Sequence, residues 1–386
     1  MSTRQSTNPR RGMTLVELLV AMGIIAVLAA LFIGAASAAT RTAREARTKQ
    51  LIARLHSLVI ERYDTYRTRR VEVNDLPDTN ASGLRGSLQN DCGFNYPSNL
   101  RGFGLDPRID AYTRLAATRE LMKLEAPDRW SDVLLIDVPV TPVRVIAPIP
   151  PRYLRESPAL RSVYLRKYNE MVANGANQAA ILENQSAECL YLFVVNATGD
   201  GEARGLFNEQ DTGDTDGDGA LEFLDGWGRP IEFLRWAPGY ESDLQLSFRG
   251  LDLIHRRAEV RTTGGLTGEQ ATRAAIEDDR DPFDLFRLDG PEGVALMNGP
   301  RSGSALTRGW RLTPLIYSGG QDEETGIRNN QTDTEGGRSY LARLNPYELD
   351  IDRDNDKTPA LGEVTDADVA ADDITNHQIS SLSRAS

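Results

Sequence analysis

The chain has 386 residues, of which 40% are hydrophobic, so it has enough apolar side chains for a buried core and is not a disordered protein. Its charges are unevenly placed: residues 1–70 contain 12 Lys and Arg against 4 Asp and Glu, and the remainder contains 32 against 52. A basic first segment before an acidic remainder suits a membrane-proximal stem with a soluble head, and it argues against nucleic acid as the partner of the head.

An apolar segment follows the basic start of the chain. Residues 18–39 are 22 residues without a formal charge, enough to cross a hydrocarbon layer as a helix. Basic residues lie on both sides of this segment, so charge alone does not fix its orientation. A secretory signal peptide with small residues at 36–38, or a plain signal anchor, would share these features. Neither of them explains Glu17, a carboxylate at the start of the apolar run.

The residues around Glu17 form a motif. Residues 10–20 read Arg-Arg-Gly-Met-Thr-Leu-Val-Glu-Leu-Leu-Val, which closely resembles the cleavage and methylation motif of type IV prepilins and type II secretion pseudopilins. The resemblance implies that a prepilin peptidase cuts after Gly12 and methylates Met13. It also implies that Glu17 pairs with the terminal ammonium of Met13 on a neighbouring subunit, and such a pair offsets the cost of burying either charge.

The helix that starts in the apolar segment should continue beyond it. No proline occurs between Pro9 and Pro77. Leu51, Leu55, Leu58 and Val59 recur at helical spacing. We expect one helix from Met13 to about Arg70, on the order of 85 Å long.

The head (residues 74–386) begins with a mixture of loops and helices. Residues 74–105 are rich in turn-forming residues, and residues 133–151 alternate Val and Ile with several prolines, as in an extended edge segment. Helical patterns cover about Tyr112–Leu124, Pro158–Asn174 and Gln178–Cys189, the last running into the apolar stretch Leu190–Val195.

Three short blocks in the second half of the head indicate strands. Residues 225–233 predict a turn and a strand with Ile231 and Phe233 on one face, residues 312–322 predict a strand and a loop, and residues 372–376 read Asp-Asp-Ile-Thr-Asn. In this order they resemble the Trp-Gly-x-Pro strand, the calcium loop and the Asp-Ile-Thr segment of the major type II secretion pseudopilin. About 70 and about 45 extra residues separate the blocks, and 75–190 has no counterpart there. With a head this bulky, a minor or tip position in a filament is an alternative to the place of the abundant shaft subunit.

The predicted fold class is therefore α+β, with a long N-terminal transmembrane helix packed on an antiparallel β head that carries large loop and helical insertions. The expected parts are a leader at 1–12, a transmembrane helix at 13–39, its periplasmic continuation at 40–73, an inserted region at 74–190 and a pseudopilin-like β head at 191–386.

Two acidic segments are candidate calcium sites. The family resemblance implies that Asp322, Asp373 and also Asp372 hold calcium, with a solvated acidic turn as the alternative. Independently, residues 214–225 have the spacing of an EF-hand loop with a glycine, Gly219, at its sharp turn. Its candidate ligands are Asp214, Asp216, Asp218, Glu222 and Asp225, and the alternative is an acidic loop without a metal.

The two cysteines, Cys92 and Cys189, are too few for a disulfide scaffold or a cysteine-based zinc site. A single bridge between them and two buried thiols are both compatible with the sequence.

No catalytic motif stands out in the sequence. The three histidines, His56, His255 and His377, are scattered, and none belongs to a metal or triad motif. We therefore expect a structural subunit of a type II secretion pseudopilus, anchored once in the inner membrane with its head in the periplasm. The expected partners are prepilin peptidase, other pilin-like subunits and the inner-membrane assembly platform, with structural Ca²⁺. A minor pilin of a type IV pilus or DNA-uptake system is the alternative, and a membrane-anchored enzyme is a more distant one.

Overall fold

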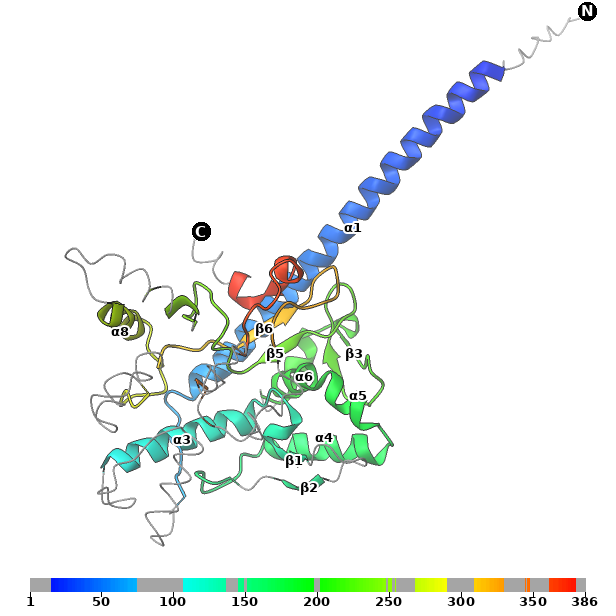
Figure 1. Cartoon of the computed structure of the whole chain (residues 1–386). Helices are drawn as coiled ribbons and strands as arrows, with labels where there is room; N and C mark the ends of the chain where they lie inside the picture. Colours follow the sequence, from blue (N-terminus) through cyan, green and yellow to red (C-terminus); the bar gives the residue numbers. More distant parts are fainter. Residues whose placement is uncertain are drawn as a thin grey trace, which may run out of the picture. The chain divides into compact units, whose positions relative to one another are not determined.

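The computed structural model describes residues 15–74, 107–136, 145–148, 151–197, 202–247, 249–251, 254, 268–289, 309–329, 344, 346–347 and 361–379. The chain divides into two compact units, Met1–Ala46 and Arg47–Ser386. The expected α+β class is confirmed, because a long apolar N-terminal helix is followed by helices and antiparallel strands (Figure 1).

The helix α1 runs from Leu15 to Thr65 (Figure 1). It ends five residues before the expected Arg70, because the chain tightens into turns at its end. The backbone N–H of Tyr66 donates to the carbonyl of Tyr63 at 3.2 Å, and the Thr65 hydroxyl donates to the carbonyl of Arg62 at 2.7 Å. Such short-range bonds satisfy the last carbonyls of a helix and stop its propagation.

Four helices precede the strands of the second half of the head: α3 (Pro107–Glu125), α4 (Arg161–Ala173), α5 (Gln178–Glu183) and α6 (Gln185–Ala197). The helices expected at 112–124 and 158–174 are confirmed. The third expected helix is divided at Asn184, and the apolar stretch 190–195 continues α6. A further helix, α8, spans Gly268–Asp278 and was not predicted.

The strands among the described residues form three small antiparallel sheets. β1 (Leu134–Ile136) pairs with β2 (Val145–Pro148), within the segment expected to be extended, and β3 (Thr212–Gly213) pairs with β4 (Glu222–Phe223). The third sheet has the order β5-β6-β7, with β5 at Glu232–Leu234, β6 at Leu315–Ser318 and β7 at Ile374–Thr375. Its strands come one each from the three blocks that the sequence singled out. Short 3₁₀ helices lie at Trp130–Asp132, Glu202–Leu206, Glu209–Asp211 and Val369–Ala371.

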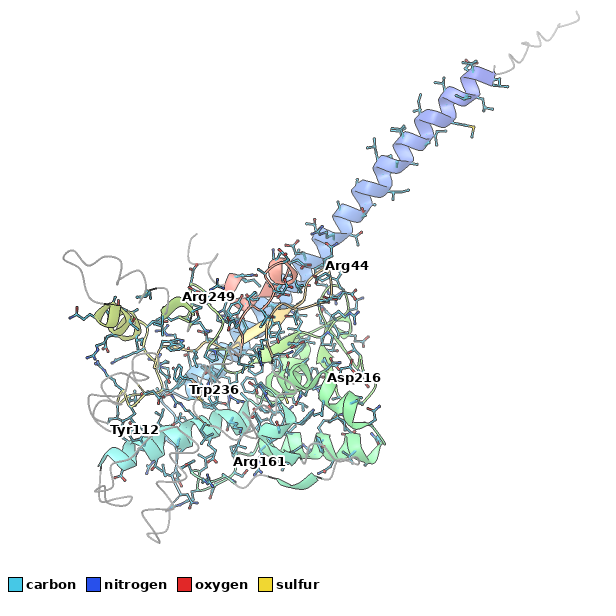
Figure 2. All side chains as sticks on the ribbon, viewed as in Figure 1. Arg44, Tyr112, Arg161, Asp216, Trp236 and Arg249 are labelled. Atoms are coloured by element: carbon cyan, nitrogen blue, oxygen red, sulfur yellow. The ribbon has the colours of Figure 1, made fainter. Side chains whose placement is uncertain are left out.

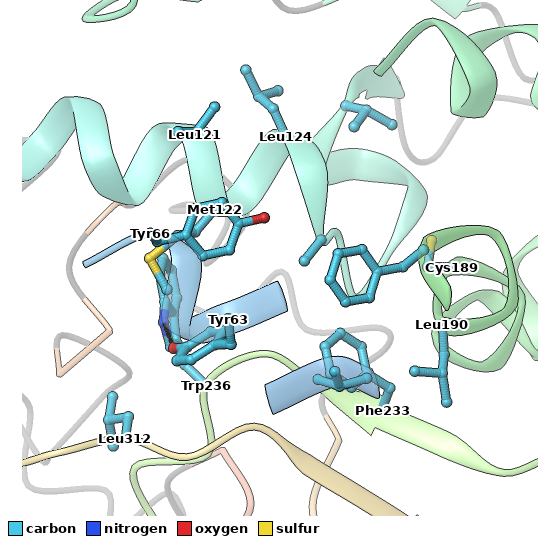
Figure 3. Close-up of a cluster of buried hydrophobic side chains, with 14 of the residues drawn as sticks. Tyr63, Tyr66, Leu121, Met122, Leu124, Cys189, Leu190, Phe233, Trp236 and Leu312 are labelled. Atoms are coloured by element: carbon cyan, nitrogen blue, oxygen red, sulfur yellow. Dashed lines mark hydrogen bonds between the residues drawn. The ribbon is translucent and has the colours of Figure 1, made fainter. Parts of the chain in front are cut away.

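One large hydrophobic core joins the end of α1 to the head. Leu51, Ile52, Leu55 and Val59 of α1 are buried in it together with residues of α3, α6, β5 and β6. Figure 3 shows Tyr63, Tyr66 and Trp236 gathered in this core, and the Trp236 indole N–H donates to the Tyr63 hydroxyl at 3.2 Å. Burial of these aromatic side chains stabilises the unit and orders the segments around them.

Polar contacts also tie α1 to the head within the second unit. Arg47 forms an ion pair with Asp211 at 2.8 Å, just before β3. The Thr48 hydroxyl accepts a hydrogen bond from the backbone N–H of Gly226 at 2.8 Å, just after β4. These contacts hold both ends of the β3–β4 hairpin, and the loop between its strands is the acidic segment predicted to bind calcium.

Candidate functional site

The first part of α1 carries an unbroken apolar surface. Large side chains of this part, from Leu15 to Ile33, are exposed in the isolated chain, with Leu15 79% and Phe32 75% exposed (Figure 2). By its length and composition α1 can cross a membrane. An apolar surface this long needs a lipid environment or neighbouring helices to cover it.

Glu17 lies in the first turn of α1. A carboxylate in this position interacts favourably with the partial positive charge of the helix N-terminus. Gly12 and Met13 lie outside the described residues, so cleavage and methylation there stay predictions from the motif.

The predicted calcium loop brings three of its carboxylates together. One oxygen each of Asp214, Asp216 and Asp218 lies within 4.8 Å of the other two. The turn needs Gly217 and Gly219, which have φ angles of 77° and 97° that a side chain would disfavour. Their backbone N–H groups donate to the two oxygens of Asp214 at 2.7 and 3.0 Å. The loop is therefore folded around the first aspartate of the motif, as the spacing predicted.

A second group overlaps the first and includes a residue that the sequence analysis missed. Oxygens of Glu188, Asp216 and Glu222 also lie within 4.8 Å of one another. Glu188 projects from α6 and is fully buried, and its Oε2 accepts a hydrogen bond from the Trp130 indole N–H at 2.7 Å. The available signal was a single carboxylate among apolar residues of one helix, but only the tertiary structure shows which loop it faces.

The electrostatics of the cluster are those of crowded carboxylates. Burial, together with Asp218 and Asp216, raises the pKa of Glu188 to about 10. Burial and neighbouring carboxylates also raise the pKa of Glu222 to about 8 and that of Asp216 to about 6. Glu188 Oε1, Asp216 Oδ2 and Asp218 Oδ2 are buried and accept no hydrogen bond from the described residues. Such a site strongly favours a bound cation or proton.

Asp225, the predicted last ligand of the loop, points elsewhere. Its Oδ1 accepts hydrogen bonds from the backbone N–H groups of Trp227 and Arg229, and its Oδ2 accepts from the Ser318 hydroxyl. In an EF-hand a helix after the loop brings position twelve back to the ion. Here the extended strand β4 follows the loop and carries Asp225 away, so position nine, Glu222, joins the cluster instead.

The second predicted calcium segment is a tight turn in which the three aspartates lie near one another. Asp372 Oδ2 accepts from the backbone N–H groups of Gln321 and Asp322 at 2.6 and 3.1 Å. Burial, helped by Asp372 and Asp322, raises the pKa of Asp373 to about 7, and its Oδ1 is buried without a partner among the described residues. Two groups of carboxylates in the described part of the chain are close enough for one ion, and neither includes these aspartates. Calcium at this turn stays a prediction.

Cys189 is a buried free thiol in α6, and burial raises its pKa well above the usual value. Cys92 lies outside the described residues, so the structure tests neither the bridge nor the alternative of two buried thiols.

Comparison with known proteins gave one match. The family model described as the prokaryotic N-terminal methylation motif matches residues 7–33. No curated protein and no solved structure matches the chain.

The matched segment contains Gly12, Met13 and Glu17 and overlaps the exposed apolar surface of α1. The motif implies processing by prepilin peptidase and assembly with other pilin subunits, and it points to a structural subunit rather than an enzyme. The motif and the apolar helix together support a type IV pilin-like protein with a prepilin-type N-terminus.

Proposed function

We propose that the chain is a structural subunit of a type II secretion pseudopilus, cleaved after Gly12 and assembled through α1. Before assembly, the mature subunit is anchored in the inner membrane with its head in the periplasm. The assembly platform then moves it into the filament. Glu17 pairs there with the methylated amine of Met13 on a neighbouring subunit.

One observation carries the choice of a secretion pseudopilin. The three blocks that resemble the major pseudopilin are far apart in the sequence, yet they supply β5, β6 and β7 of one sheet. The helix α8 lies between the first two blocks in the sequence and is not part of this sheet. Three blocks of one pseudopilin-like head are expected to meet in one sheet, as these three do.

The end of this sheet also contacts α1. The Asn376 side chain, just after β7, accepts from the backbone N–H of Ile316 at 2.8 Å and lies 2.8 Å from the His56 ring on α1. A head attached in this way would transmit force between the filament core and its surface, as a pilin subunit requires.

The first test is processing. Co-expression with a prepilin peptidase, followed by mass spectrometry of the purified chain, should find a mature N-terminus at methylated Met13. A start at Ala39 would instead indicate an ordinary signal peptide.

The second test is assembly. Glu17→Ala should abolish incorporation into filaments while leaving membrane insertion intact. Glu45→Ala removes a carboxylate from the same helix beyond the apolar run and is the matched control. Normal filament formation by Glu17→Ala would contradict the proposed pairing of Glu17 with the amine of Met13.

The third test separates the kinds of filament. Deletion of the chain in its host should reduce export of secreted proteins and leave twitching and DNA uptake unchanged. Loss of twitching or uptake with normal export would assign the chain to a pilus or DNA-uptake system.

A further inference from the structure

We propose that Glu188 of α6 joins Asp214, Asp216, Asp218 and Glu222 of the β3–β4 loop in one structural calcium site. This donor set differs from the one that the loop sequence alone predicts, because it adds a ligand from a distant helix and omits Asp225. The site is inferred from residues of the head alone, so it would be the same in any kind of filament.

The first argument is distance. Two oxygens on one Ca²⁺ ion, each about 2.4 Å from it, are at most about 4.8 Å apart. Both overlapping groups of oxygens meet this limit, and Asp216 belongs to both. Because the two groups share Asp216, we place the single ion beside this residue, between the loop and α6.

The second argument is the state of the buried oxygens. Glu188 is 0% exposed and Asp218 is 2% exposed, and each has one carboxylate oxygen without a hydrogen-bond donor among the described residues. The Trp130 indole holds the other oxygen of Glu188, which orients the side chain. A buried carboxylate oxygen without a donor is costly, and a cation removes that cost.

The third argument is charge. In the described part of the chain, no Arg or Lys forms an ion pair with any of the five carboxylates, although other buried acids of the head do have such partners. Arg47 lies nearby but is bonded to Asp211. The cluster therefore needs its positive charge from outside the chain.

The chemistry of the donors selects the metal. All five are hard carboxylate oxygens, and Ca²⁺ accepts six to eight oxygen ligands in flexible geometry. Mg²⁺ requires a compact octahedron and retains its water, so an all-carboxylate loop of this kind favours Ca²⁺. The bound ion would add to the packing of α6 on the β3–β4 hairpin, where the rings of Tyr191 and Phe223 lie 5.2 Å apart.

The test uses the full chain in detergent, freed of metal by a chelator. We expect Ca²⁺ to raise its melting temperature and Mg²⁺ at the same concentration to have little effect. Glu188→Gln keeps an oxygen for the Trp130 N–H but removes one ligand charge, and Asp216→Asn does the same in the loop. Both variants should weaken Ca²⁺ binding by about tenfold or more. Glu209→Gln, an exposed glutamate on the neighbouring 3₁₀ helix, is the control and should bind as the unaltered chain does.

A second measurement covers the case in which a variant folds poorly. Tb³⁺ replaces Ca²⁺ at such sites and emits when a nearby indole is excited, so excitation of Trp130 should sensitise it. At saturating Tb³⁺, Trp130→Phe should lose most of this emission, and because it also removes the hydrogen bond that orients Glu188, its Ca²⁺-dependent rise in melting temperature should be smaller than that of the unaltered chain. The proposal is wrong if Ca²⁺ does not shift the melting temperature, or if Glu188→Gln binds Ca²⁺ as tightly as the unaltered chain.

Discussion

Asp225 accepts a hydrogen bond from the Ser318 hydroxyl at 2.6 Å, and this bond joins residues 93 positions apart in the chain. The other Asp225 oxygen accepts from the backbone N–H groups of Trp227 and Arg229 at 2.8 and 3.0 Å. One carboxylate therefore fixes both the turn before β5 and the end of β6. These bonds align the two strands, and Asp225 is not part of the carboxylate groups of the preceding loop.

Replacing Asp225 separates these two roles. Asp225→Ala removes charge-assisted hydrogen bonds from the buried Ser318 hydroxyl and from a half-buried turn, and we expect it to lower the free energy of unfolding by about 2 to 3 kcal/mol. The Ca²⁺-induced rise in melting temperature should persist in this variant. Denaturant unfolding with calcium and with chelator measures both effects. If Asp225→Ala lost the calcium response as Asp216→Asn does, Asp225 would be a ligand after all.

A buried ion network supports the junction of α3 with β5. Arg235, just after β5, forms an ion pair with Asp132 at 2.8 Å, and Lys123 of α3 lies 3.4 Å from the same carboxylate. All three side chains are buried. Asp132→Ala leaves two buried cations without this partner, and we expect a loss of about 3 to 5 kcal/mol in unfolding free energy.

The matched control for Asp132 is an exposed ion pair. Glu170 on α4 lies 3.5 Å from Lys167, and its side chain is 57% exposed. Glu170→Ala should change the unfolding free energy by about 0.5 kcal/mol or less. Equal effects of the two variants in the same denaturant titration would mean that Asp132 is not energetically coupled to Arg235.

The parts of the fold that the sequence predicted depend on local patterns. Each pattern lies within one short stretch of sequence and predicts the helix or strand that this stretch forms. Examples are the apolar run, the helical spacing at residues 112–124 and the alternation around Phe233. The loop at residues 214–222 was predictable for the same reason, because the glycines and aspartates that build it are consecutive. Even the end of α1 deviated by only a few residues, since capping contacts decide it.

What the sequence did not predict depends on contacts between distant segments. Glu188 is 26 or more residues from the loop carboxylates, and nothing in its own helix indicates which loop it faces. Asp225 lies away from the other loop carboxylates because β4 is extended by its pairing with β3, and the loop motif does not encode this pairing. The apolar stretch 190–195 belongs to α6, which contacts β4, β5 and α4. Because this part of the helix is buried on several faces, its sequence lacks the apolar and polar alternation of a surface helix.

The tight turn after β6 makes a prediction about glycine. Gly320 has a φ of 68°, and a Cβ there would collide with the backbone carbonyl of Asp372. Gly320→Ala should therefore separate the β6 turn from the segment before β7 and cost about 1 to 3 kcal/mol. Gly205→Ala, where a Cβ meets nothing within 4 Å, is the control and should be close to neutral. Thermal unfolding compares the two, and equal melting temperatures would show that the turn relaxes without cost.

His377 gives the head a dependence on pH. This residue follows β7 in the sequence and is buried, and its Nδ1 lies 2.8 Å from the Ser242 hydroxyl. Burial lowers the pKa of the His377 ring to about 4. The unfolded chain has a histidine pKa of about 6.5, so it takes up a proton at a higher pH than the folded chain does. The contribution of His377 to stability is therefore complete above pH 6.5 and falls as the pH drops towards 4.

His377→Gln should remove this contribution. Several carboxylates of the head titrate in the same range, so the useful quantity is the difference in unfolding free energy between the unaltered chain and the variant. We expect this difference to fall by roughly 3 kcal/mol between pH 7 and pH 4, because each pKa unit corresponds to about 1.4 kcal/mol. Denaturant titrations at half-unit pH steps measure it. A difference that stays constant with pH would mean that His377 binds its proton equally well in the folded and unfolded chains.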